Sequence, residues 1–190
     1  ELHKKKIPFL SFYEAVDFKP GLTDVEKERV ESSLLEMGIL DSLIVHPQYI
    51  HLVKECDSIL IPSPLKGNDT LLQFLDINLP DKALELEIVT RDILRSIGIS
   101  ENEENSFVTN FGHYQHGIVK GFAVPREASI YIGKEARKKH REKMLFSLRS
   151  ELAEMDTMQS DLDIRLRDIK ERIILLRDEY ERLLSLDAAE

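Results

Sequence analysis

Two histidines, His113 and His116, are the residues whose type and spacing come closest to a chemical function in this chain. They lie in the segment HYQH, and an HxxH pair on a loop can chelate a metal ion when carboxylates join it. Because two neighbouring histidines are more often ordinary surface residues, the pair by itself predicts no metal site. Its role stays open, and one alternative is a small hydrolase or nuclease that uses both histidines with nearby acids and loses activity on His116→Ala.

Other signatures of catalysis or ligand binding are missing from the sequence. The 8 glycines include no phosphate-binding loop, there is no GxSxG elbow, and the single cysteine, Cys56, has no CxxC partner for zinc. We therefore expect neither a catalytic residue nor a cofactor in this chain. A lone cysteine favours a reducing, cytoplasmic location, and Glu1 at the first position indicates an excised or processed fragment.

The last third of the chain carries the strongest pattern, a heptad repeat. Its a positions are Leu145, Leu152, Gln159, Leu166, Ile173 and Tyr180, and its d positions are Leu148, Met155, Leu162, Ile169, Leu176 and Leu183. We call these residues the seam. All of them except Gln159 are apolar or aromatic, and many of the flanking e and g positions are charged. A straight helix has about 3.6 residues per turn, so a seam kept at about 3.5 needs a partner helix wound around it.

The seam lies in a helical pattern that runs from about Arg126 to about Leu186, roughly 90 Å of helix at ~1.5 Å per residue. The residues before it form a compact part that spans only about 30–40 Å. Most of the helix must therefore meet another helix, either from a longer chain or from a second copy. Leucine dominates the seam and specifies the oligomeric state weakly, whereas Gln159 at an a position can fix the register.

The net charge of −9 is unevenly distributed. Residues 134–149 carry 7 Lys and Arg against 2 Glu, whereas the segments on both sides are acidic overall. The basic residues that we expect to contact DNA phosphates are Lys4, Lys5, Lys6, Lys134, Arg137, Lys138, Lys139, Arg141 and Lys143. The simpler alternative is that they solvate an exposed helix face. No aromatic-rich basic groove suggests that base sequence is read.

The remaining patterns predict an α+β fold, with a compact hinge-like domain of mixed strands and helices over residues 1–133 and a coiled-coil arm over 134–190. Thr23 and Glu26 match a capping box that starts a helix ending near Met37. A second long helix is expected at 81–97, with Leu84, Ile88, Leu94 and Ile97 facing the core. The other expected elements are an extended segment at 7–18, strands at 50–53 and 58–61, a helix at 70–75, and a hairpin of strands at 107–109 and 117–124 around a polar loop. No apolar run approaches the roughly 20 residues that cross a membrane.

Three separated blocks of the sequence resemble one protein family. Residues 11–22, SFYEAVDFKPGL, are similar to the family's LVDFRPG-type opening, and residues 35–42, LEMGILDS, are similar to its LEAAGLLDAW stretch. Residues 125–137, PREASIYIGKEAR, resemble its KPAAEYIGATAR segment, which leads into a basic coiled coil. One segment departs from the family, because its GxFxxGPLxG pattern is reduced to the Phe and Gly spacing of residues 106–117, SFVTNFGHYQHG.

The family is that of the MukB-like SMC subunits, JetC, of Wadjet plasmid-defence systems. The resemblance implies a hinge region with part of one arm, homodimerisation through the globular part, and an antiparallel partner helix for the coiled coil. It also implies that the whole protein is an ATPase that extrudes DNA loops, with ATP and magnesium at a head domain absent from this chain. Kleisin-type and nuclease subunits are the implied partners.

A hinge brings its two chain ends together, which would merge Lys4–Lys6 with the basic residues at 134–143 into one patch for double-stranded DNA. Such contact would be with phosphates and would weaken steeply with salt. The main alternative is a stand-alone adaptor that dimerises through the coiled coil and recruits a protein partner. In that case the globular part stays monomeric.

Overall fold

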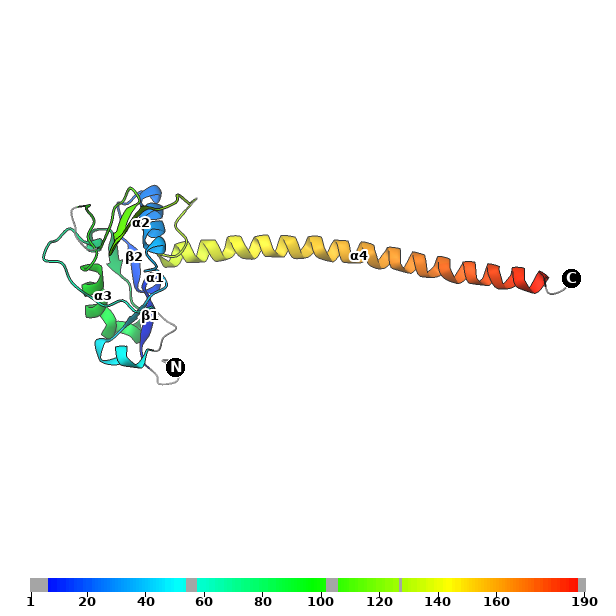
Figure 1. Cartoon of the computed structure of the whole chain (residues 1–190), viewed down its shortest axis with the longest axis horizontal. Helices are drawn as coiled ribbons and strands as arrows, with labels where there is room; N and C mark the ends of the chain where they lie inside the picture. Colours follow the sequence, from blue (N-terminus) through cyan, green and yellow to red (C-terminus); the bar gives the residue numbers. More distant parts are fainter. Residues whose placement is uncertain (1–6, 54–57, 102–105, 127, 188–190) are drawn as a thin grey trace. The chain divides into compact units, whose positions relative to one another are not determined.

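The computed structural model describes residues 7–53, 58–101, 106–126 and 128–187, with side chains described up to residue 182 (Figure 1). The chain forms two compact units, Glu1–His140 and Arg141–Glu190. The first unit mixes short strands with helices, and a long helix ends the chain, which confirms the predicted combination of a mixed compact domain and a C-terminal helix. None of the described helices has the length and apolar character that crossing a membrane requires.

One helical turn interrupts the extended segment predicted at 7–18. Strands β1 (Phe9–Ser11) and β2 (Val16–Phe18) flank helix α1 (Phe12–Ala15) and enter different sheets. Strand β1 pairs antiparallel with β3 (Leu43–Val45), and β2 pairs antiparallel with β4 (Leu75–Ile77). The turn carries Phe12 and Ala15 into the core, where both are fully buried.

Helix α2 (Asp24–Glu36) confirms the predicted capping box. The Glu26 backbone N–H donates to Thr23 Oγ1 at 3.3 Å, and the Thr23 backbone N–H donates to Glu26 Oε2 at 2.8 Å. Gly38 has φ +71°, a left-handed conformation that ends the helix and that favours glycine.

The middle of the chain departs from the prediction because short 3₁₀ turns replace longer elements. Of the residues predicted as a strand at 50–53, the first three belong to the turn η1 (Pro47–Leu52). The strand predicted at 58–61 is reduced to one bridge between Leu43 and Ile59. The predicted helix at 70–75 is the single turn η2 (Leu71–Gln73).

The helix predicted at 81–97 is also divided. It consists of a 3₁₀ segment, η3 (Asp81–Leu86), and helix α3 (Glu87–Leu94), and Ala83 within η3 has a non-helical φ of −125°. Leu84 and Ile88 are exposed, so that part of the prediction is wrong, because a regular helix already places Ile88 on the side opposite Ile97. Leu94 and Ile97 are buried as predicted, and Leu86, Val89 and Ile93 complete this part of the core.

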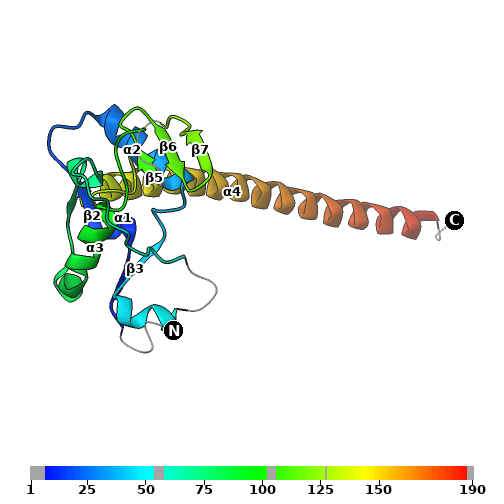
Figure 2. The same cartoon turned by 60° about the vertical axis from the view of Figure 1, so that its left-hand side comes forward.

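A third sheet contains three strands where two were predicted. Strands β5 (Ser106–Val108), β6 (His113–His116) and β7 (Val119–Phe122) are antiparallel neighbours and lie beside α2 (Figure 2). Strand β6 is the segment expected to be a polar loop. The Tyr114 ring of β6 lies over Gly121 of β7, where an added Cβ would come within 2.6 Å of the ring, so close packing there needs glycine.

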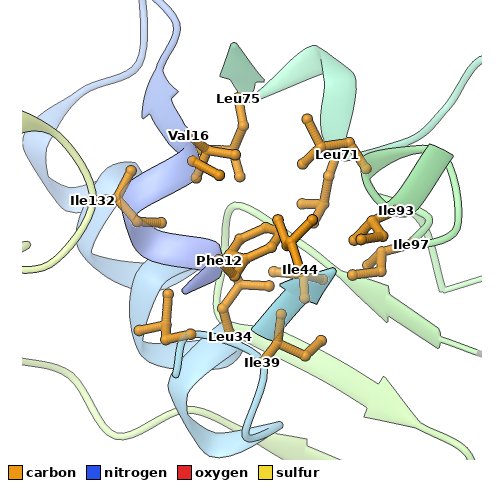
Figure 3. Close-up of a cluster of buried hydrophobic side chains, with 14 of the residues drawn as sticks. Phe12, Val16, Leu34, Ile39, Ile44, Leu71, Leu75, Ile93, Ile97 and Ile132 are labelled. Atoms are coloured by element: carbon orange, nitrogen blue, oxygen red, sulfur yellow. The ribbon is translucent and has the colours of Figure 1, made fainter. Parts of the chain in front are cut away.

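The core of the first unit surrounds Phe12. Figure 3 shows Phe12 with Leu34, Ile39 and Ile44 around it and Ile132 nearby. Ile132 is only 1% exposed, so the segment that leads into the last helix is part of the core.

Helix α4 (Lys134–Asp187) begins later than the predicted start near Arg126. Residues 126 and 128–133, here called the linker, are not helical, and Gly133 closes them with φ +95°. A Cβ on Gly133 would come within 2.8 Å of the Asp17 carboxylate, so both the backbone angle and the close approach require glycine. The first unit includes the beginning of α4, residues 134–140, whereas the sequence placed the division at 133.

Candidate functional site

The seam lies on α4 as one continuous, exposed apolar surface. The sequence from Lys134 to Asp187 contains neither glycine nor proline, which favours an uninterrupted helix of 54 residues. The apolar and aromatic seam residues from Leu145 to Tyr180 are between 45% and 64% exposed. Gln159 is also exposed, and the Leu183 side chain lies outside the described part. No single helix can bury this surface against itself, so it is suited to pairing with another helix.

The linker is held by a buried carboxylate on α2. Glu31 is only 2% exposed, and its Oε1 accepts the backbone N–H of Ile130 at 2.6 Å. Its Oε2 accepts the N–H groups of Tyr131 at 3.0 Å and Ile132 at 2.7 Å. In a helix that began near Arg126 these N–H groups would bond the carbonyls four residues before them. Here Glu31 accepts them instead, so they are paired without a helix.

Two opposing effects act on the pKa of Glu31. Burial disfavours the charged carboxylate and raises its pKa above the ordinary value of 4.5, while the three N–H donors and the charge of Arg126 favour the carboxylate and act in the opposite direction. Burial is the larger effect. The proton on Glu31 is therefore coupled to the anchoring of the linker.

A second carboxylate, Glu28, holds the start of the linker. It is buried one helical turn before Glu31 and accepts the Arg126 backbone N–H at 2.7 Å. The hydroxyl of Ser32 donates to the same oxygen at 2.8 Å, and the Arg29 Nε lies 3.6 Å from the other oxygen. Glu28 and Glu31 together hold the linker on α2 at two places, Arg126 and Ile130–Ile132.

The beginning of α4 is anchored by Arg137. One nitrogen, Nη1, donates to the backbone carbonyls of Tyr13 at 2.9 Å and Tyr131 at 2.8 Å. The guanidinium carbon also lies 5.7 Å from the centroid of the Tyr13 ring. Arg137 thus links α1, which is close to the first described residues, with the linker and the start of α4.

The predicted DNA-binding residues lie in different environments. Lys134, Lys138, Lys139, Arg141 and Lys143 have exposed side chains on α4, whereas Arg137 is half-buried and used in the contacts just described. Lys4, Lys5 and Lys6 lie outside the described residues, as does Cys56. The exposed residues form a dense cationic segment that can attract phosphates.

The two histidines of the HYQH segment contact different partners. His113 Nδ1 lies 3.8 Å from Glu101 Oε1, and His116 Nδ1 lies 3.1 Å from Ser106 Oγ. Lys120 Nζ binds the other oxygen of Glu101 at 2.8 Å, and this bond lowers the pKa of Glu101. Among the described residues, no group of three or more histidine, cysteine, aspartate or glutamate side chains is placed to hold a metal ion.

Sequence reasoning missed Glu28 and Glu31 as structural residues. A signal was present for Glu31, which lies three residues before Leu34 and so on the apolar side of α2. A carboxylate on that side has to be paired when it is buried. Its partners, which lie about a hundred residues later in the chain, gave no local signal.

Comparison with known proteins adds no assignment, because no protein-family model, curated protein or solved structure matches this chain.

Proposed function

We propose that this chain is the hinge region of an SMC-like ATPase, a homodimerisation module that carries part of one coiled-coil arm. The observation that carries the proposal is the seam, which stays exposed over α4 and requires a partner helix. The sequence resemblance to JetC supplies the wider role, in DNA-loop extrusion for defence against plasmids. ATP hydrolysis belongs to a head domain outside this chain.

The anchoring at the beginning of α4 supports a hinge. Glu28, Glu31 and Arg137 hold the linker and the first residues of α4 on the body of the first unit. Arg137 also contacts Tyr13, close to where the described chain begins. A hinge needs its two chain ends close together, and this contact joins the start of α4 to α1, whereas Ile7, the first described residue, packs in a separate cluster with Val45.

Disruption of the seam tests the proposal against the adaptor alternative. In the complete chain, Leu162→Glu with Ile169→Glu puts two charges at d positions, and Ile164→Glu with Ile174→Glu puts the same charges at exposed apolar positions outside the seam. Light scattering across a dilution series measures the mass of both variants. A hinge stays dimeric in both, because the first unit dimerises by itself. An adaptor becomes monomeric in the seam variant alone, and this result would reject the hinge.

DNA contact is the second part of the proposal. Exposed Lys138, Lys139 and Arg141 are expected to neutralise phosphates, so replacing all three by glutamate should weaken binding to duplexes of any sequence and flatten the salt dependence of the affinity. The control replaces Lys66 and Lys82 by glutamate; both are exposed and lie elsewhere on the first unit. Equal loss in both variants would argue against a specific role of the α4 residues.

A further inference from the structure

The sheet β5–β6–β7 ends in an open edge. Strand β7 is the outer strand, and no other described strand pairs with its free side. The Ala123 N–H donates to Gly112 O at 2.8 Å, toward β6. Because backbone groups alternate in direction along an antiparallel strand, the N–H and C=O groups of Lys120 and Phe122 point to the open side. We call this side, with the residues 118–124 that border it, the β7 edge.

Apolar side chains gather on the β7 edge and beside it. Ile118 in the hairpin turn is fully exposed, and Val119, Phe122, Val124 and neighbouring Phe111 are each more than half exposed. The Phe122 ring is held in place, with the Arg29 guanidinium 5.3 Å from its centroid and the His113 ring packed edge-on at 5.2 Å. An exposed apolar strip along an unpaired strand is typical of a surface that another strand covers.

The charge on the β7 edge does not protect it from pairing. A lysine on an edge strand usually discourages association because its ammonium group needs water. Here Lys120 Nζ binds Glu101 at 2.8 Å and lies 5.6 Å from the centroid of the Phe107 ring. This half-exposed ion pair offsets part of the charge that Lys120 brings to the edge.

We propose that the occupant of the β7 edge is the β7 edge of a second copy, paired antiparallel around a twofold axis. The inference rests on the proposed hinge function and names the surface through which the first unit dimerises. An open antiparallel edge is self-complementary, since each copy offers the same donors and acceptors in reverse order.

The strand itself selects the register. Residues directly opposite each other in an antiparallel pair lie on the same face, so the twofold axis has to pass through a residue, either Lys120 or Gly121 at the middle of β7. An axis through Lys120 would place two lysines opposite each other. An axis through Gly121 keeps the two Lys120–Glu101 pairs apart, and it places Ile118 opposite the partner copy's Val124, which gives an apolar pair.

A charge exchange in the complete chain tests the surface and its register together. The parent is the variant with Leu162→Glu and Ile169→Glu, so that only contacts of the first unit are measured. Ile118→Glu with Val124→Glu places like charges opposite each other twice and should weaken the dimer about tenfold or more in sedimentation equilibrium. Ile118→Glu with Val124→Lys places opposite charges there and should restore most of the affinity. Ile61→Glu with Ile88→Glu, at exposed positions elsewhere, should leave it unchanged.

Each outcome decides between the proposals. A parent that is monomeric at every concentration rejects the hinge function itself. A dimeric parent that is not weakened by Ile118→Glu with Val124→Glu, or that is weakened equally by the control, keeps the hinge and rejects the β7 edge. Weakening without recovery in the variant with Ile118→Glu and Val124→Lys rejects the register through Gly121.

Discussion

The entry into α4 and the seam along it use apolar and charged residues in opposite ways. At the entry, Ile132 is buried in the core and half-buried Arg137 donates hydrogen bonds to carbonyls of the same unit. In the seam region, residues of the same types, such as Ile169 and Arg165, are exposed to solvent. The first region is complete in one chain, whereas the second has the composition of an interface without its partner. A residue type alone therefore does not say whether it stabilises the fold or an assembly.

The largest expected effect on stability comes from removing the Glu31 carboxylate at the entry into α4. Glu31→Ala leaves one buried and two half-buried N–H groups without their acceptor, and we expect the free energy of unfolding of the first unit to fall by about 4 kcal/mol. Urea denaturation followed by circular dichroism measures the loss. The control Glu36→Ala, at an exposed position of the same helix, should change it by less than about 0.5 kcal/mol. Similar losses in both would contradict the anchoring role of Glu31.

An isoleucine pair compares the two regions directly. Ile132→Ala opens a cavity in the core and should cost about 3 kcal/mol, while Ile169→Ala, which is 57% exposed, should leave the stability of the first unit unchanged. Ile169→Ala should instead weaken pairing with the partner helix. Denaturation curves report the first effect, and binding of a peptide of the opposite arm would report the second. A large stability loss from Ile169→Ala would show that the seam is already covered within the chain.

An arginine pair makes the same comparison for charge. Arg137→Ala removes two hydrogen bonds and a ring contact and should destabilise the first unit by about 2 kcal/mol. Arg141→Ala removes an exposed cation and should alter stability by less than about 0.5 kcal/mol while reducing affinity for duplex DNA. The two variants are compared by thermal unfolding and by DNA titration. If Arg137→Ala weakened DNA binding without loss of stability, Arg137 would act as a DNA contact like the exposed lysines and arginine, and its anchoring role would be rejected.

The smallest effect is a pH dependence carried by Glu31. Its folded-state pKa lies above its ordinary value, so the folded state binds the proton more tightly than the unfolded state does. The stabilisation is fully present below the ordinary pKa and is lost as pH rises through the folded-state pKa. The free energy of unfolding of the wild type minus that of Glu31→Gln should therefore be more positive near pH 4 than near pH 8. A difference that grows with pH would show that the N–H donors outweigh burial and lower the pKa.

Local patterns were sufficient where the interactions are local. The α2 cap was predicted from Thr23 and Glu26 because the bonds of a capping box join residues three apart. Strand β6 was missed because its polar, aromatic sequence does not alternate, and its pairing with β5 and β7 is seen only in the folded sheet. The start of α4 was placed too early because the donors of the linker bind Glu28 and Glu31, which are distant in sequence.

The sequence by itself determined the long helix and the seam along it, because a heptad repeat is a property of spacing along one helix. Only the tertiary structure decided where that helix begins, since Glu31, Asp17 and Gly133 meet through the folded core. It also decided which basic residue is structural, because the contacts of Arg137 are with backbone carbonyls of α1 and the linker. The open edge of β7 likewise appears only in the folded sheet, because an edge is defined by which strands fail to pair with it.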